Sequence, residues 1–168
     1  MPKLIENLPQ RLAEEACRQV REAGYASLTI RSVAKGCGVG VGTVYNYYPS
    51  KDALVAAFLL ADWKIALQAI SAAAESAGGP EPVLLAIHEN LTGFYELHAC
   101  VFRDEAAAPG FAGSFSRYHG VLRSQLAAPL RPFCRDDFMA DFIAEALLTW
   151  TIAGKSFSEI YTLVQKLF

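Results

Sequence analysis

The sequence predicts an all-α protein in which a small three-helix N-terminal domain, residues 1–50, precedes a larger helical body, residues 51–168. Apolar residues recur at the three- and four-residue spacing of helices, and the alternation typical of a half-buried strand occurs nowhere. Glycine and proline interrupt this pattern at intervals that indicate about eight or nine helices. A chain of 168 residues is long enough for such a head and body.

The first helix is indicated by apolar residues at every fourth position from Leu8 to Val20, and Gly24 is a natural stop at its C-terminus. Thr29 is expected to cap a second, short helix over residues 30–35, which two nearby glycines close. Both ends of each helix are therefore predicted from local residues alone.

A third helix is expected over residues 41–47 and ends before Pro49, because the residue preceding a proline disfavours the α conformation. Ser50 then caps a long apolar helix that reaches about Glu75. The remaining body helices are expected over residues 83–102, 114–128, 137–153 and 157–168, the last two capped by Asp136 and Ser156.

The second and third helices have the arrangement of a helix-turn-helix unit, whose second helix enters the DNA major groove. Gly38 permits the tight turn between them, where φ can be positive. The residues expected to form the small core of this unit are Val33, Ala34, Val39, Val44 and Tyr48. Those expected on the outward side are Val41, Thr43, Tyr45, Asn46 and Tyr47, with Lys51 at the start of the next helix.

The distribution of charge agrees with this interpretation better than the net charge of −2 does. Residues 1–51 contain seven lysines and arginines against four glutamates, a net charge of +3. The other residues contain eight bases and thirteen acids, a net charge of −5. A basic head on an acidic body suits a protein whose head alone meets phosphates.

Several other classes are not supported by the sequence. The N-terminus has no apolar segment typical of a secretory signal, and no apolar run is expected to reach the roughly 18–20 residues that span a bilayer. The four cysteines lie far apart and predict reduced thiols in a cytoplasmic protein, not disulfides or a zinc site. No cofactor, metal or membrane partner is expected.

The motif itself is more specific than a general helix-turn-helix. The run Thr29-Ile-Arg-Ser-Val-Ala, and then the run from Gly38 through Thr43-Val-Tyr-Asn-Tyr-Tyr-Pro-Ser-Lys to Leu54, resembles the signature of the TetR family of bacterial transcriptional regulators. The resemblance covers residues from about 10 to 54 and includes the preceding Gly24-Tyr25 pair. The rest of the chain shares the helix count of that family but no motif.

The resemblance implies roles for individual residues. The positions implied to meet the phosphate backbone are Thr29, Arg31, Tyr47 and Lys51. The positions implied to lie in or against the groove are Thr43, Tyr45 and Val41, with Asn46 beside them and Gly42 allowing close approach. Gly40 stands where the family often has a capping hydroxyl, so this helix is expected to lack a side-chain cap. Arg31 could equally form an intramolecular ion pair.

The last two helices present apolar faces suited to dimerisation, and in the resembling family these helices form a four-helix bundle with their copies. A helix-turn-helix monomer makes few contacts, so two half-sites are usually read by a dimer. The residues expected at this interface are Phe138, Phe142, Ile143, Ala146, Trp150, Phe157, Ile160, Tyr161 and Val164. Packing inside the chain is the alternative for some of them.

The middle helices mix aromatic and polar residues, which is the composition of a ligand pocket. The residues expected to line a cavity for an aromatic or amphipathic molecule are Phe58, Trp63, His88, Leu91, Tyr95, Phe102, Phe115, Tyr118, His119 and Leu122. The sequence does not name the ligand.

Two other functions are weighed against a regulator with a ligand pocket. An enzyme could use Cys100 with His98 or His88, but no catalytic motif accompanies them. A redox-sensing regulator could use Cys37, which lies in the turn beside the recognition helix. We favour a homodimeric repressor, bound to double-stranded operator DNA and released by a small apolar or aromatic effector; an activator remains the alternative.

Overall fold

A computed structural model describes residues 7–104 and 119–168, and these residues are helical with no strand among them. The predicted all-α class is confirmed. The chain divides into two compact units. The head contains the described residues 7–62 and 98–104, and the body contains the described residues 63–97 and 119–168. The expected boundary at residues 50 and 51 stays a prediction, and the head unit extends beyond it.

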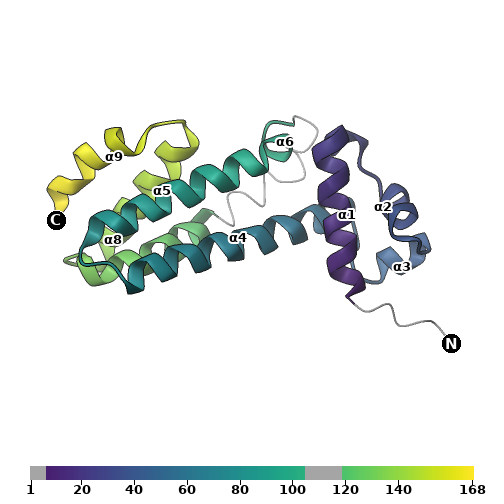
Figure 1. The fold of residues 1–168 in the computed structure, drawn as a ribbon, viewed down its shortest axis with the longest axis horizontal. Helices are drawn as coiled ribbons and strands as arrows, with labels where there is room; N and C mark the ends of the chain where they lie inside the picture. The colour runs from purple at the N-terminus through teal and green to yellow at the C-terminus, as the bar shows by residue number, and fades with distance from the viewer. Residues whose placement is uncertain (1–6, 105–118) are drawn as a thin grey trace. The chain divides into compact units, whose positions relative to one another are not determined.

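The head groups three helices around a small core, as Figure 1 shows at the purple and blue end of the chain. Its elements are α1 (Leu8–Ala23), η1 (Tyr25–Ser27), α2 (Ile30–Cys37), α3 (Val41–Tyr45), the first half of α4 (Lys51–Glu75) and α6 (Ala99–Phe102). The apolar stripe predicted for α1 is buried in this core, and the helix ends at Gly24, whose φ is 79°. A glycine adopts that conformation without the strain that a Cβ atom would cause.

A capping box begins α2, as the sequence predicts. The Ser32 amide donates to Thr29 Oγ1 at 3.0 Å, and the Thr29 amide donates to Ser32 Oγ at 3.2 Å. The helix continues to Cys37, two residues beyond the expected end. Gly36 stays within the helix, and Gly38, with φ 69°, is the residue that ends it.

The third helix is shorter than predicted, because α3 ends at Tyr45 and the next two residues form a turn. The amides of Tyr47 and Tyr48 both donate to the Val44 carbonyl, at 3.0 and 2.9 Å. At the other end, Gly40 supplies no side-chain cap, as expected. The helix therefore depends on its packing more than on its own hydrogen bonds.

The long helix α4 corrects the expectation that no apolar run approaches the length of a membrane span. Its 25 residues include an 18-residue window with mean hydropathy 1.7, enough by length and composition to cross a membrane. One third of that window is buried in the protein. The buried residues of α4 belong to the cores of both units: Leu54, Val55 and Phe58 in the head, and Trp63, Ala66 and Ile70 in the body. We therefore interpret α4 as a core helix.

The body is built around α5 (Pro80–Leu97) and α8 (Asp137–Ile152), which lie side by side (Figure 1). The other elements are a helical stretch at residues 119–127, η2 (Ala128–Phe133), α9 (Phe157–Val164) and η3 (Gln165–Leu167). The start of the helix expected over residues 114–128 lies outside the described residues. The predicted caps are present: Asp136 accepts from the Met139 amide at 2.8 Å, and Ser156 forms a capping box with Glu159.

The predicted bounds of two body helices were wrong. The helix expected over residues 83–102 begins at Pro80, since a proline is tolerated in a first turn where its missing N–H has no intrahelical partner. It ends at Leu97, and the non-helical backbone of His98 (φ −111°, ψ 16°) separates it from α6. The last helix ends at Val164 rather than Phe168, and its final turn tightens into η3.

Candidate nucleic-acid interface

The head core fixes α3 by a single apolar anchor. Val44 is fully buried against a core that includes Val33 and Ala34, which confirms the predicted contact between the two helices. Val39 and Tyr48 are partly buried against the same core, and the Tyr48 hydroxyl donates to the Pro9 carbonyl at 3.0 Å. This bond ties the residues after α3 to the start of α1.

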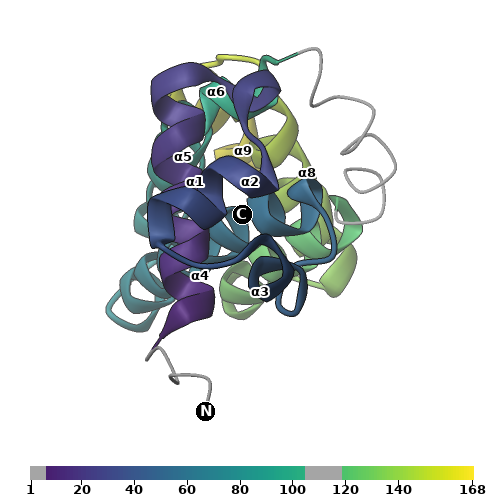
Figure 2. The ribbon, with the colours of Figure 1, turned by 90° about the vertical axis from the view of Figure 1, so that its right-hand side faces the viewer.

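The opposite side of α3 is exposed, and Figure 2 shows α2 and α3 toward the viewer. Tyr45 and Tyr47 are 53% and 48% exposed, and Val41 is 36% exposed. Gly42 and Asn46 are exposed as well, whereas Thr43 is half-buried. Tyr45, on α3, and Tyr47, in the turn that follows it, are thus two large aromatic side chains that the head core leaves about half exposed.

A shallow hollow lies beside this exposed side and brings together residues that are distant in the sequence. It has a volume of about 480 Å³. Its lining consists of Leu28, Thr29, Ile30, Arg31, Val41, Tyr45 and Lys51. Five of these are predicted DNA contacts, from the start of α2, from α3 and from the start of α4. The remaining predicted contacts are Gly42, Thr43, Asn46 and Tyr47, which do not line the hollow.

The charged residues that line the hollow are Arg31 and Lys51, both of them positive. Arg31 is exposed on α2, and the Lys51 ammonium lies 3.9 Å from the centroid of the Tyr25 ring. Tyr25 is buried, and its hydroxyl donates to Asp52 Oδ1. Burial and the neighbouring Asp52 carboxylate raise the pKa of Tyr25, so the hydroxyl stays protonated and donates. The sequence analysis did not identify Tyr25 and Asp52 as part of this site.

The expected ligand-pocket residues fall in both units, and many have partners of their own. In the head, Phe58 is buried with its ring stacked on His98 at 5.7 Å, and Phe102 is 38% exposed. In the body, Trp63 donates through Nε1 to Gln125 Oε1 at 2.8 Å and packs edge-on against Phe94.

The other members of that set have the following positions. His88 Nε2 lies 3.0 Å from the Lys155 carbonyl oxygen, and His119 Nε2 lies 3.5 Å from Glu145 Oε1. Leu91 is buried, whereas Tyr95 and Leu122 are half-buried. Phe115 and Tyr118 lie outside the described residues. A second hollow, about 440 Å³, is lined by Gly24, Ala99, Cys100, Arg103 and Asp104, none of which belongs to the expected set. The ligand pocket stays a prediction.

The expected dimer residues separate into two groups by burial. On α8, Phe138, Phe142 and Trp150 are 78%, 54% and 52% exposed, and Ala146 is half-buried. Ile143, Ile160 and Val164 are buried in the body core of their own chain, which is the alternative given for some of these residues. At about 100° per residue, Ile143 turns away from its neighbour Phe142 and toward this core.

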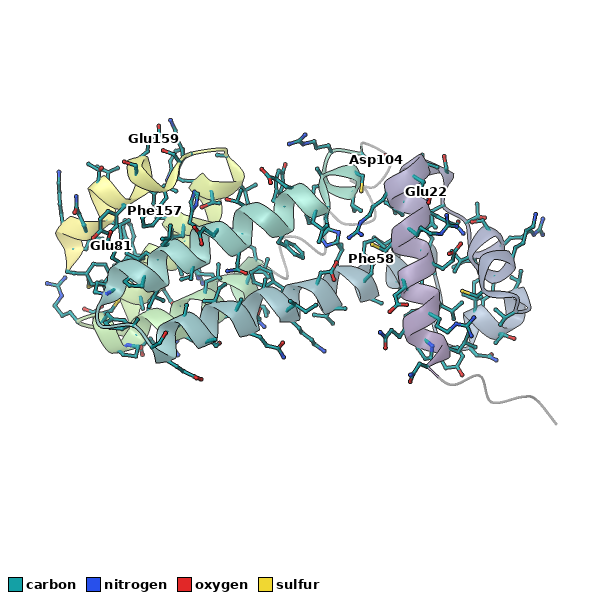
Figure 3. All side chains as sticks on the ribbon, viewed as in Figure 1. Glu22, Phe58, Glu81, Asp104, Phe157 and Glu159 are labelled. Atoms are coloured by element: carbon teal, nitrogen blue, oxygen red, sulfur yellow. The ribbon has the colours of Figure 1, made fainter. Side chains whose placement is uncertain are left out.

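The half-buried residues of α9 pack along the surface of the body. Phe157, labelled in Figure 3, stacks on Tyr161 with ring centroids 5.2 Å apart, and the Tyr161 hydroxyl donates to Glu81 Oε2 at 3.0 Å. Leu163 is 68% exposed, and Leu167 and Phe168 are exposed too. Of these three, only Phe168 belongs to the apolar face that the sequence indicates for the last helix.

The geometry does not favour the two alternative functions. His98 is buried, with Nε2 3.0 Å from Asp62 Oδ2, and no group of three metal-ligating side chains occurs within residues 7–104 and 119–168. The Cys37 thiol lies 3.5 Å from the Arg11 carbonyl oxygen, to which it can donate. Burial raises the pKa of Cys37, whereas a redox-sensing thiol normally has a lowered pKa.

Comparison with known proteins identifies the motif. Residues 12–58 match the family model described as bacterial regulatory proteins, tetR family. This match lies within the head, which is therefore similar to the DNA-binding domain of the TetR family. Over 53 residues, 31% of this chain, it is 36% identical to the HTH-type transcriptional regulator UidR of Escherichia coli strain K12. That match spans 27% of UidR, so it concerns only part of each protein.

The fold extends the likeness beyond the head. GusR of Salmonella enterica has a TM-score of 0.72 at 21% identity, with 98% of both chains covered. FadR of Thermus thermophilus, described as a TetR family transcriptional repressor in complex with lauroyl-CoA, has a TM-score of 0.63 at 19% identity. It covers 95% of this chain and 92% of FadR. At these identities the likeness establishes the fold alone.

Proposed function

We propose that this protein is a cytoplasmic, homodimeric, ligand-controlled repressor that binds double-stranded operator DNA through α3. The observation that supports DNA binding best is the exposed side of α3 and of the turn after it, where Tyr45 and Tyr47 are exposed near a hollow lined by Arg31 and Lys51. Aromatic and small polar side chains on α3 can contact base edges and sugars, while the basic residues contact phosphates and set the register.

The first experiment asks whether the chain selects a DNA site. The full chain is incubated with a pool of random duplexes, and the bound sequences are recovered and sequenced. A dimer that presents two copies of α3 is expected to select an inverted repeat with half-sites separated by about 34–36 Å or a multiple of it. Recovery of unselected sequence at low salt would contradict specific DNA recognition.

A matched pair of basic residues on α2 tests the contact surface. Arg31 lines the hollow, whereas Lys35 is exposed on the same helix outside it. The Arg31→Gln variant is expected to weaken binding to the selected duplex and to reduce the salt slope, d log K/d log[salt], by about 0.9, the value for one lost phosphate contact. Lys35→Gln is the control and should leave the slope unchanged. Equal slopes for the two variants would place the phosphate backbone elsewhere.

We also propose that a small-molecule effector releases the protein from DNA. It is supported by the fold shared with FadR, which is described in complex with lauroyl-CoA, and by the aromatic residues of the body. An effector that releases DNA must bind the DNA-free form more tightly, and DNA must weaken effector binding by the same factor. A panel of aromatic and acyl compounds is screened by thermal shift of the full chain. A compound that binds and leaves the affinity for the selected duplex unchanged is not an effector, and a panel of binders with that property would overturn the mechanism.

A further inference from the structure

The side chain of Lys51 is held in place by a residue outside the recognition motif. Its ammonium lies 3.9 Å from the centroid of the Tyr25 ring, well within the distance of a cation–π interaction. Tyr25 lies in η1, directly after α1, and Lys51 begins α4, so the contact joins segments 26 residues apart in the sequence. A lysine has four rotatable side-chain bonds, and contact with a fixed ring restricts them.

The Tyr25 ring is itself fixed on several sides. It is buried in the head core, and its hydroxyl donates to Asp52 Oδ1. The backbone beside it is also bound, because the Ala26 amide donates to Asp104 Oδ2 at 3.3 Å. Tyr25 thus binds the side chain of Asp52 with its hydroxyl and the neighbouring ammonium of Lys51 with its ring, which sets the orientation of the first residues of α4.

The position of Lys51 in the hollow indicates a function for this orientation. Lys51 lines the same hollow as Thr29 and Arg31, from the opposite end of the helix-turn-helix segment. A ring contact, unlike an ion pair with a carboxylate, does not itself neutralise the ammonium, so the positive charge can still attract an anion. We propose that Tyr25 is a positioning residue that presents the Lys51 ammonium to a phosphate of the DNA backbone. This inference rests on the proposed DNA binding.

A double-mutant cycle tests the coupling between the two residues. The full-length variants Tyr25→Leu, Lys51→Gln and their combination are titrated with a mixed-sequence DNA duplex at several salt concentrations. Lys51→Gln is expected to reduce the salt slope by about 0.9. Tyr25→Leu is expected to weaken binding about two- to fivefold in the presence of Lys51, the effect of losing an exposed cation–π contact, and to have no effect in the Lys51→Gln background. An equal loss in both backgrounds would show a purely structural role and overturn the inference.

Tyr25→Phe provides the second variant, because it keeps the ring and removes the bond to Asp52. In the Tyr25→Phe protein, Lys51→Gln should weaken DNA binding as much as it does in the wild-type protein. Nuclear magnetic resonance of the wild-type chain adds a readout that needs no variant to fold: the ring should shift the Lys51 methylene protons upfield. Unshifted protons would overturn the inference even if DNA binding stands. A wild-type chain that fails to bind the duplex at low salt would overturn both the inference and the proposed function.

Discussion

The exposed aromatic side of α8 gives a quantitative prediction about dimerisation. Phe142 is 54% exposed, which leaves about 110 Å² uncovered if a phenylalanine presents about 200 Å². Burial of this area at about 25 cal/mol/Å² would contribute about 2.7 kcal/mol in each protomer, and about 5 kcal/mol in a twofold-symmetric dimer. A tenfold change in Kd corresponds to about 1.4 kcal/mol.

The Phe142→Ala substitution should therefore weaken the dimer strongly. Alanine keeps the β-carbon, and buried area never converts fully to affinity, so we expect the dimer Kd to rise about a hundred- to a thousandfold rather than the full factor. Sedimentation velocity over a range of protein concentrations measures this constant directly. Far-ultraviolet circular dichroism of the same samples checks that the variant remains helical.

An exposed apolar residue on another helix supplies the control. Ile65 lies on α4 and is 64% exposed, and it is not part of the α8 side. Ile65→Ala should leave the dimer Kd unchanged within a factor of about two, because a substitution that removes no contact at the interface has little effect. The reasoning is refuted if the Ile65 and Phe142 variants change the Kd equally, or if the wild-type chain is a monomer at every concentration.

Three further predictions concern the stability of the head. Gly40→Ser should raise the free energy of unfolding by about 0.5 kcal/mol in urea titrations, because it adds a side-chain cap at φ −73° and its Cβ atom meets only Thr43 Oγ1, at 3.8 Å. Gly38→Ser, at φ +69°, should lower the free energy of unfolding by about 1 kcal/mol. A change of the same sign in both variants would contradict this account. Thr29→Ala should lower the free energy of unfolding by about 1 kcal/mol, whereas Thr29→Ser should have little effect because it keeps the capping hydroxyl. Equal stability of the two variants would show that the capping box contributes little. Burial lowers the pKa of His98 below its ordinary 6.5, so the unfolded chain takes up a proton first as the pH falls. The free energy of unfolding should therefore decrease as the pH falls below about 6.5, and His98→Gln should reduce this decrease.

The helix ends could be predicted from the sequence where one local interaction determines them. Thr29, Asp136 and Ser156 all cap the helices that they were expected to cap, because a hydroxyl or carboxylate needs only an amide three residues ahead. Gly24 and Gly38 end helices for a similarly local reason, their positive φ. The break at His98 could not be predicted, because no glycine or proline marks it.

Predictions that depend on packing were less complete. On α8, an apolar residue could face either its own core or a partner, and the sequence pattern does not distinguish Ile143 from Phe142. The same difficulty applies to the ligand pocket, which would be assembled from residues of several helices. Phe58 proved to be stacked on His98 within the head, a pairing across 40 residues that no local pattern indicates.

The structure of α3 connects the stability of the head with the proposed binding. A helix of five residues without a side-chain cap is far below the length at which helices are stable alone in water. Its conformation therefore depends on one buried residue, Val44, and on the turn that Tyr48 ties to α1. Because the remaining side chains of α3 are not needed for that anchoring, substituting Tyr45 should weaken the proposed DNA binding with little effect on the stability of the head.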